Sequence, residues 1–184
     1  NYLATGENPA RLGNAHPNIV PYQTFATNDG SLILAIGNDQ QFEKFCHAAN
    51  CEALSRNVLF QTNQQRVINR AELIPILATI IAKQSTDYWV EKLEAIAVPC
   101  GPVNTLKQVF NHPQIKHRNM VKQVPDQDGV MIKTVASPIN LSDTPLQYKY
   151  AAPNIGQHSE QILRQFLYYD DEQVTELMSN AIVV

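Results

Sequence analysis

The sequence has no long hydrophobic run and no excess of basic residues. Its 184 residues include 14 lysines and arginines against 17 aspartates and glutamates, which gives a formal net charge of −3. A nucleic-acid-binding surface needs a basic excess, and a membrane-spanning helix needs about 18 consecutive apolar residues. We therefore expect neither a nucleic acid nor a membrane among the partners of this chain.

Cysteine is also scarce. The three cysteines, Cys46, Cys51 and Cys100, form no CxxC pair and have no histidines at zinc-ligand spacing. A disulfide framework or a zinc site is therefore not expected, and a reducing, cytoplasmic location is the simplest interpretation. We expect the three thiols to be small, buried apolar side chains.

The N-terminus carries no secretory signal segment, which would be a charged stretch followed by an apolar one. It does not begin with methionine, and residues 1–10 are typical of the interior of a protein. We interpret the chain as a fragment or a processed piece of a longer protein.

The feature most indicative of function is a polar loop that leads into a predicted strand, Arg11–Gln23. Its first residues have neither helical nor strand periodicity, and Pro17 lacks a backbone donor and favours a turn at Asn18. A loop at the start of a strand is a common place for binding residues. His16, Asn18 and Gln23 are therefore candidate polar contacts to a ligand.

Each candidate also has a structural interpretation. A lone loop histidine is more often structural than catalytic, and amides in turns usually bond to backbone groups. No serine, cysteine or aspartate stands at a spacing that would make a nucleophile–base pair with His16. The residues by themselves therefore show no complete catalytic set, which needs a nucleophile, a base and a charge stabiliser in one cleft.

Further clusters of polar residues are weaker candidates. His112 and His117 are off the i, i+4 spacing of two metal ligands on one helix face. Asp126 and Asp128 flank a hairpin turn and lack the other oxygen ligands of a calcium loop. Gly37–Asp39 is a strand-to-helix junction that can bind an anion, but it has a single glycine and no lysine. We expect no metal in this chain.

The secondary-structure patterns predict an α+β fold with a small antiparallel sheet and several helices. Strands over 22–27 and 31–36 flank Asn28-Asp29-Gly30, where Asp-Gly supplies the positive φ of a tight hairpin turn. A helix from Gln40 to about Asn50 follows, capped by Asn38 or Asp39.

A mainly helical middle is predicted next. Asn63 caps a helix from about Gln64, and Pro75 kinks it or marks a break near Arg70. Another helix begins at Ser85 or Thr86, with Trp89 as a core anchor. The two prolines in 96–103 exclude a central strand there.

The last third combines short helices with a second hairpin. Strands over 120–124 and 130–135 flank a longer loop, and 137–139 continue the second strand. Residues 143–153 have no clear period, which is typical of a surface connection. The helices are predicted from Asn104 or Thr105 to Phe110, over 114–118, from about His158 to Phe166, and after Asp170 or Asp171.

Several short motifs together resemble the family III CoA-transferases, the group that includes the carnitine dehydratase and bile-acid-inducible proteins. They occur in the family's order and cover almost the whole chain. The motifs are Gly13-Asn14-Ala15-His16-Pro17, Pro21-Tyr22-Gln23, Asp29-Gly30, Ala35–Phe42, Asn69-Arg70, Trp89, Val98–Val103, Pro113-Gln114 with Arg118, Ser137-Pro138-Ile139 and Pro153–Ser159.

The resemblance covers only the C-terminal half of the family. It implies a linker and active-site loop over 1–19, a small α+β domain over 20–142, and a connection with C-terminal helices over 143–184 that packs on a large α/β domain. It also implies a homodimer with interlocked subunits.

The resemblance further implies that CoA thioesters and carboxylic acids are the substrates. The nucleophile of the family is an aspartate that lies upstream of this chain, where it forms anhydride and thioester intermediates. No catalytic residue is therefore expected here, and the fragment alone is expected to be inactive. His16, Pro17, Asn18 and Gln23 correspond to the loop that covers the reacting thioester.

The loop sequence also separates branches of the family. The formyl-CoA branch has a run of glycines at the position of His16-Pro17-Asn18. The sequence His16-Pro17 resembles instead the succinyl-CoA-dependent dicarboxylate branch and other general members of the family. An α-methylacyl-CoA racemase of the same family remains an alternative function. A structural or dimerising domain without activity is the alternative outside enzymes.

Overall fold

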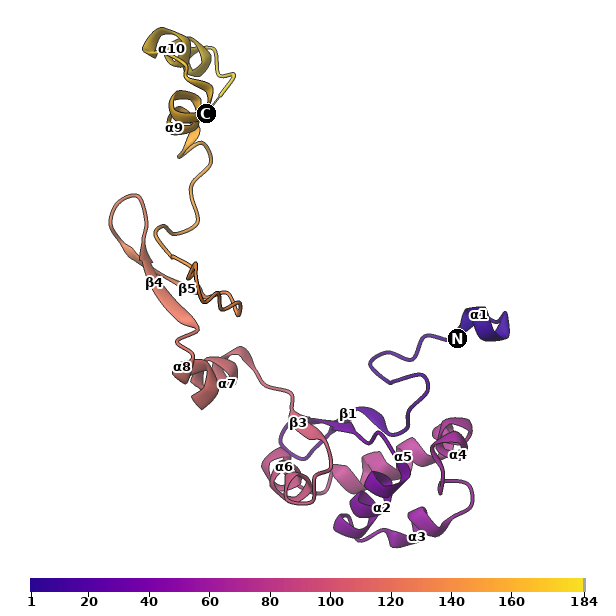
Figure 1. Ribbon diagram of the computed structural model, residues 1–184. Coiled ribbons are helices and arrows are strands. Elements are labelled where there is room, and N and C mark those ends of the chain that lie inside the picture. The colour runs from indigo at the N-terminus through magenta and orange to yellow at the C-terminus, as the bar shows by residue number, and fades with distance from the viewer. Residues whose placement is uncertain (184) are drawn as a thin grey trace. The chain divides into compact units, whose positions relative to one another are not determined.

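The computed structural model describes residues 1–183 and divides into two compact units, Asn1–Asn104 and Thr105–Val184 (Figure 1). Each unit combines helices with one small antiparallel sheet, which confirms the predicted α+β class. The predicted division into 1–19, 20–142 and 143–184 stays a prediction, because it depends on packing against the large domain that the resemblance implies.

The first unit contains one three-stranded sheet and most of the helices. The periodicity did not predict the short helices α1 and α3, and the remaining elements follow the expected order. The elements are α1 (Tyr2–Thr5), β1 (Tyr22–Ala26), β2 (Ser31–Ala35), α2 (Asp39–Ala48), α3 (Glu52–Arg56), α4 (Asn63–Ile68), α5 (Arg70–Ile81), α6 (Thr86–Glu94) and β3 (Cys100–Pro102).

The sheet has the strand order β1-β2-β3, with both pairs antiparallel. Tyr22 lies opposite Ala35 and Ala26 lies opposite Ser31, so the predicted reversal of the chain between the two strands is confirmed. The predicted turn geometry is wrong, because neither Asp29 nor Gly30 has a positive φ. The short strand β3 lies at the edge of the sheet, which is where a strand that ends in proline is tolerated.

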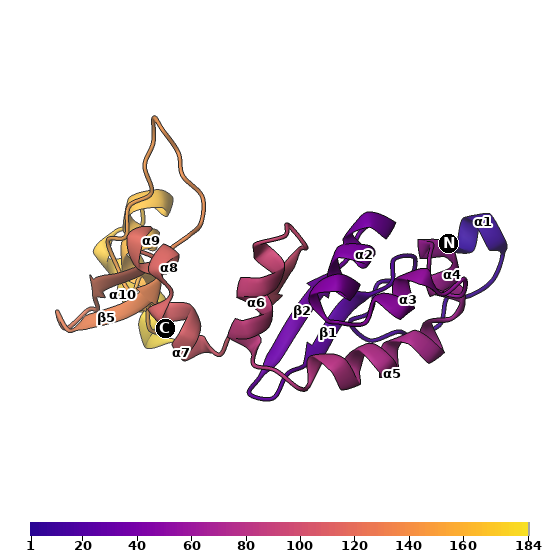
Figure 2. The same ribbon diagram turned by 90° about the horizontal axis from the view of Figure 1, so that it is seen from below.

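One face of this sheet supports the core of the unit. Leu32 and Leu34 are fully buried, whereas Ile33 between them is 41% exposed. Helix α5 contacts β1, and α6 contacts β2 and β3 (Figure 2). Burying one such leucine stabilises the fold by about 1.5–3 kcal/mol. Trp89 is the predicted anchor, with 2% of its surface exposed and its Nε1 donating to Ile81 O at 2.8 Å.

Two predictions about the helical middle need correction. Thr62, not Asn63, caps α4, and its hydroxyl accepts from the amide of Gln65. The break near Arg70 is confirmed, but it lies at Asn69, where α4 ends and α5 begins, and Pro75 lies inside α5 without breaking it. The Asn63 side chain is therefore not used as the cap of α4.

The three cysteines are free thiols. Cys46 is fully buried, but Cys51 and Cys100 are only partly buried, so the expectation of three buried thiols is wrong for these two. A hydrogen bond with Cys51 and burial both raise the pKa of the Cys46 thiol, which therefore stays protonated at neutral pH.

The second unit contains a two-stranded antiparallel hairpin and short helices. Its predicted helix caps are confirmed, because Thr105 and Asp170 each form a capping box with a glutamine three residues on. The elements are α7 (Leu106–Asn111), α8 (Pro113–His117), β4 (Val121–Pro125), β5 (Met131–Val135), α9 (Ser159–Leu167) and α10 (Asp171–Ser179).

The prediction that residues 137–139 continue the second strand is wrong. Strand β5 ends at Val135, where Val135 pairs with Val121. Pro138 has no amide proton for the ladder, and the amide of Ser137 donates instead to Tyr148 Oη at 2.7 Å. Residues 143–153 form neither helix nor strand, as predicted.

Candidate functional site

Residues 13–20, which belong to the polar loop predicted over Arg11–Gln23, are fastened to the strand that follows them. Gly13 has a φ of +61°, a conformation that favours glycine, at the turn that opens the loop. The amide of His16 donates to Tyr22 O at 2.9 Å, and the amide of Thr24 donates to Asn14 Oδ1 at 2.9 Å. The loop therefore lies beside the start of β1 at both of these points.

A second set of contacts comes from the α4–α5 region. Asn63 and Arg66 lie on α4 at i, i+3 spacing, which places them on one helical face, and Arg70 is the first residue of α5. We call these three residues the loop clamp. Asn63 Nδ2 donates to Asn18 O at 2.8 Å, and Asn63 Oδ1 accepts from the amide of Val20 at 3.0 Å. One carboxamide thus satisfies a backbone acceptor and a backbone donor of the loop.

Arg70 fastens the tip of the loop. Its Nη2 donates to His16 O at 3.1 Å and to Pro17 O at 2.7 Å. A charged guanidinium makes stronger hydrogen bonds to carbonyl oxygens than a neutral donor does. The two carbonyls around Pro17 are therefore turned toward α5.

Arg66 is the buried centre of the clamp, with none of its surface exposed. Its Nε donates to Val20 O at 2.7 Å, and its Nη2 donates to Asp39 Oδ1 at 2.8 Å. Burial lowers the pKa of Arg66, while Asp39 opposes that change. Arginine remains charged even when its pKa is lowered by burial. The loop is therefore held at Val20 O by a buried cation.

The remaining contacts of Arg66 complete its environment. Its Nη1 donates to Phe60 O at 3.0 Å and to Gln61 O at 3.1 Å. Its guanidinium carbon lies 4.5 Å from the centre of the Phe42 ring. All three guanidinium nitrogens of Arg66 donate hydrogen bonds, which is how a protein accommodates a buried charge.

The Gly37–Asp39 junction belongs to this arrangement instead of forming an anion site. Asp39 Oδ1 accepts from Arg66 and from the amide of Asn63, the latter at 2.7 Å. Asn38 caps α2 by accepting from the amide of Gln41, one of the two caps that the sequence predicts. A carboxylate already occupies this helix N-terminus, so a second anion would be repelled.

The structure brings three of the four predicted site residues together. His16 stacks on Tyr22 with ring centres 5.4 Å apart. Its Nδ1 accepts from the amide of Asn18 at 3.1 Å, which places the proton of the neutral ring on Nε2. Pro17 is exposed between these two residues.

Asn18 and Gln23 differ in their surroundings. The Asn18 carboxamide is exposed and exchanges two hydrogen bonds with Asn1, at 2.9 and 3.0 Å. Gln23 is partly buried on β1, opposite Leu34. Among residues 1–183 no hydrogen bond joins Gln23 to His16, Pro17 or Asn18. The loop thus presents an amide, a proline and one edge of an imidazole, groups that can orient a carbonyl or carboxylate.

The sequence pattern does not indicate the loop clamp. It predicts Asn63 as a helix cap, includes Arg70 only in a motif, and gives no role to Arg66. The available indication was a mostly polar segment, residues 63–70, in which these three side chains recur at helical spacing. That pattern normally describes a solvated face, and only the fold shows that this face meets the loop.

The other polar clusters have structural roles. His112 Nδ1 caps α8 by accepting from the amide of Gln114 at 3.1 Å. Asp126 Oδ1 accepts from the amides of Asp128 and Val130 at 2.9 and 2.8 Å, which confirms the predicted turn chemistry. No group of three or more potential metal ligands occurs within residues 1–183. Nor is any helix within the described range long and apolar enough to cross a membrane.

Comparison with known proteins decides the family. The sequence model of CoA-transferase family III matches residues 1–159. The chain belongs to this family. The resemblance inferred from the ordered motifs is therefore confirmed.

Several curated relatives are glutarate CoA-transferases by name. The chain is 39% identical over 165 residues to the succinate–glutarate CoA-transferase of Agrobacterium fabrum, covering 90% of this chain and 41% of that protein. It is 36% identical over 183 residues to the human succinyl-CoA:glutarate CoA-transferase, covering 100% of this chain and 42% of that protein. The chain thus spans about two fifths of the length of these relatives.

Solved structures agree with this assignment to family III. A CaiB/BaiF family protein from Brucella suis matches with a TM-score of 0.71 and 40% identity, over 88% of this chain and 41% of that one. The Rv3272 protein of Mycobacterium tuberculosis matches with a TM-score of 0.66 and 23% identity, over 77% of this chain and 40% of that one, and supports the fold alone.

Proposed function

We propose that this chain is part of a CoA-transferase that moves CoA between acyl-CoA thioesters and carboxylic acids, with succinyl-CoA and a dicarboxylate as the leading substrate pair. The observation that carries this proposal is membership of CoA-transferase family III together with 39% identity to a succinate–glutarate CoA-transferase. Since the chain spans about two fifths of that relative, the activity proposed is that of the whole protein.

In this proposal the residues His16, Pro17, Asn18 and Gln23 form the substrate-proximal loop. Two features support the role. The clamp holds the loop backbone through the carbonyls of His16, Pro17 and Asn18, while the Asn18 side chain stays exposed. A polar group on a fixed backbone is preorganised, so it stabilises developing charge without reorganising during the reaction.

The covalent chemistry is assigned to an aspartate outside this chain. Its carboxylate attacks the thioester carbonyl, the C–S bond breaks, and CoA leaves as a thiolate with an acyl-aspartyl anhydride left behind. The thiolate then attacks the aspartyl carbonyl, which releases the donor acid and leaves an aspartyl-CoA thioester. The acceptor carboxylate repeats these two steps in reverse order. Splitting one transfer into such steps is the advantage of a carboxylate nucleophile.

The C-terminal helices have a second proposed role, in packing against the large domain of the family. Helix α9 leaves Ile162 and Phe166 49% and 72% exposed. Apolar side chains exposed four residues apart on a helix favour a contact surface. A homodimer is proposed on the resemblance to the family.

The proposal is tested with the whole protein, succinyl-CoA and a panel of carboxylic acids that includes glutarate. We expect glutaryl-CoA to form with one succinate released per turnover, and we expect residues 1–184 alone to be inactive. Failure to transfer CoA to any acid would overturn the proposal. Deuterium exchange at the α-carbon without a change of acyl partner would favour the racemase instead.

A further inference from the structure

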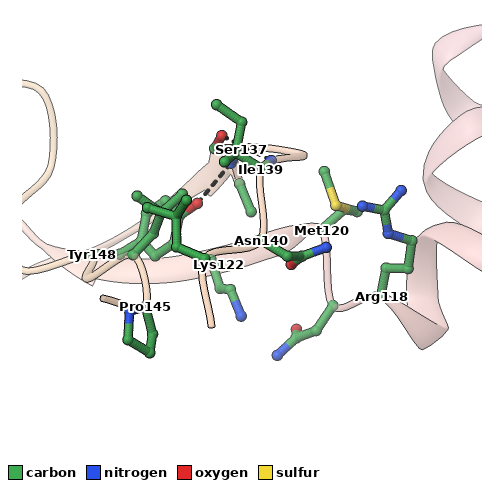
Figure 3. Close-up of a pocket in the computed structure, with 12 residues that line it drawn as sticks. Arg118, Met120, Lys122, Ser137, Ile139, Asn140, Pro145 and Tyr148 are labelled. Carbon is green, nitrogen blue, oxygen red and sulfur yellow. Dashed lines mark hydrogen bonds between the residues drawn. The ribbon is translucent and has the colours of Figure 1, made fainter. Parts of the chain in front are cut away.

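The second unit contains a pocket that the proposed transferase chemistry does not use. The pocket has a volume of about 210 Å³ and lies between the start of the β4–β5 hairpin and the chain that follows it (Figure 3). Figure 3 shows Arg118 where helix α8 ends and Lys122 on the strand that follows. The lining residues are Arg118, Asn119, Met120, Lys122, Ala136, Ser137, Ile139, Asn140, Leu141, Pro145, Leu146 and Tyr148.

Hydrogen bonds fix the walls of this pocket. Arg118 Nη2 donates to Pro138 O at 3.1 Å, and Tyr148 Oη accepts from the amide of Ser137 at 2.7 Å. The amide of Ile139 donates to Ser137 Oγ at 3.2 Å. The segment after β5 is thus held by hydrogen bonds on both sides of Pro138, so the wall of the pocket has a defined conformation.

The charge of the lining is entirely positive. Arg118 and Lys122 are its charged members, and its other residues are neutral. Within residues 1–183 neither cation takes part in an ion pair. The Asn119 carboxamide is oriented so that its nitrogen donates to Val121 O and its oxygen accepts from Lys122 Nζ at 3.1 Å. The other two ammonium protons of Lys122 remain available.

Two neutral residues of the lining add hydroxyl donors. The hydroxyls of Tyr148 and Ser137 each accept a backbone amide proton, so their own protons are free to point elsewhere. A pocket with two cations and spare hydroxyl donors matches an anion with several oxygens. Its volume is below the range of about 300–1,000 Å³ typical of larger ligands.

We propose that this pocket binds a small oxyanion, either a phosphate or a carboxylate group, between Arg118 and Lys122. The proposal is independent of the transferase chemistry, since it involves other residues. The binding is electrostatic, so the affinity falls as ionic strength rises.

The test titrates inorganic phosphate into the intact protein at low ionic strength, with amide chemical shifts as the readout. We expect saturable shifts at Ser137, Ile139 and Asn140. Acetate carries one charge against the two cations, and we expect it to bind more weakly than phosphate. Absence of saturable shifts at these amides would overturn the proposal, and equal affinity for acetate would overturn the two-cation arrangement.

Lys122→Gln removes one cation while keeping most of the stem, and Lys133→Gln is its matched control. Lys133 is an exposed residue on β5 of the same hairpin and does not line the pocket. We expect Lys122→Gln to weaken phosphate binding roughly tenfold, as loss of one charge-assisted hydrogen bond would, and Lys133→Gln to leave it unchanged. Equal weakening by both variants would contradict a specific site.

Arg118→Lys separates charge from geometry. It keeps the positive charge but loses the planar guanidinium that reaches Pro138 O. We expect this variant to retain phosphate binding more fully than Arg118→Gln. The opposite order would contradict the role of charge. A circular dichroism spectrum that matches the wild type establishes that each variant is folded.

Discussion

At the scale of single residues, Arg66 has the largest structural role near the site. It is fully buried and donates to the carbonyls of Val20, Phe60 and Gln61 as well as to Asp39. Removing a buried donor leaves its acceptors without partners, and that cost exceeds the net value of the bonds.

We expect Arg66→Met to lower the free energy of unfolding by about 3 kcal/mol, because Asp39 and the three carbonyls lose their hydrogen-bond donor. Urea denaturation of both proteins measures the change. Arg56→Met is the matched control, since Arg56 is exposed at the end of α3, and we expect little change there. A loss as small as that of the control would contradict the role assigned to Arg66.

Asp29 is a second residue with a specific structural contribution. Its Oδ1 accepts from the amide of Thr86 at 2.8 Å and from the hydroxyls of Thr86 and Thr27, both at 3.1 Å. The hydrogen bond from the Thr86 backbone is the main cause that lowers the pKa of Asp29 below its ordinary value of 3.8. Asp29 thus links the hairpin turn to the start of α6.

This lowered pKa predicts a pH dependence with a definite sign. The charged form is favoured in the folded state, so its contribution to stability is present above the ordinary pKa and is lost as the pH falls through the folded pKa. We expect Asp29→Asn to be less stable than wild type at neutral pH, with a difference that shrinks below about pH 4. Thermal unfolding across this range measures it.

The control for this experiment is Asp128→Asn, which removes the same charge from an exposed turn without disturbing the contacts to Thr86. A difference between wild type and Asp29→Asn that stays constant down to about pH 2 would contradict the linkage to this carboxylate.

At the scale of elements, the loop clamp shows how a helical face and a loop depend on each other. The loop has no helical or strand period, so its backbone groups lack the hydrogen bonds that a helix or sheet would supply. Arg70 and Asn63 supply those partners by bonding to the backbone of residues 16–20. Order in the loop therefore follows from its contacts to the α4–α5 region.

We expect Arg70→Met to loosen the loop without unfolding the first unit. Losing these hydrogen bonds costs about 1 kcal/mol, which corresponds to roughly fivefold faster amide exchange at Asn18 and Val20. Hydrogen exchange followed by NMR measures it. Lys83→Met, a change at an exposed residue after α5, is the control. Unchanged exchange in Arg70→Met would show that the loop does not depend on this contact.

At the scale of the whole molecule, the two units differ in how much core they bury. The large buried cluster, which includes Leu32, Leu34, Phe45 and Trp89, lies in the first unit. Within residues 105–183 of the second unit, the buried apolar side chains are Val124, Ala136, Leu163 and Val174. Because stability follows buried apolar area, the units are not equally stable.

We therefore expect the slowest amide exchange in β1 and β2 and faster exchange in β4 and β5, by roughly tenfold or more. The hairpin of each unit provides the control for the other, since both are antiparallel pairs of five-residue strands. Equal protection of the two hairpins would contradict this ranking.

The proposed function adds a prediction for the whole enzyme. We expect Asn18→Ala to lower kcat more than it raises the KM for the CoA substrate, because a loop over the reacting group acts on the intermediate. Steady-state kinetics with the whole protein measures both constants. An unchanged kcat with a raised KM would count against this role of Asn18. Ala15→Gly, a neighbouring change without loss of a polar group, is the control.

Much of the secondary structure could be predicted because its causes are local. Thr105 and Asp170, for example, specify helix starts through groups within a few residues. The chain reverses at Asp29-Gly30 as predicted, but without the positive φ expected of that pair. The failures have non-local causes. Asn63 is a good cap by type, yet its side chain bonds to the loop, and the strand expected at 137–139 loses its pairing to Tyr148.

The sequence by itself determined the family, the hairpins and most helix boundaries of this protein, since motif order and local backbone preferences are properties of the chain. It also pointed to the loop that contains His16, Pro17 and Asn18. Only the tertiary structure decided what holds that loop. Arg66 and Arg70 lie more than forty residues from the loop carbonyls that they bind, and a contact over that separation depends on the packing of the whole unit.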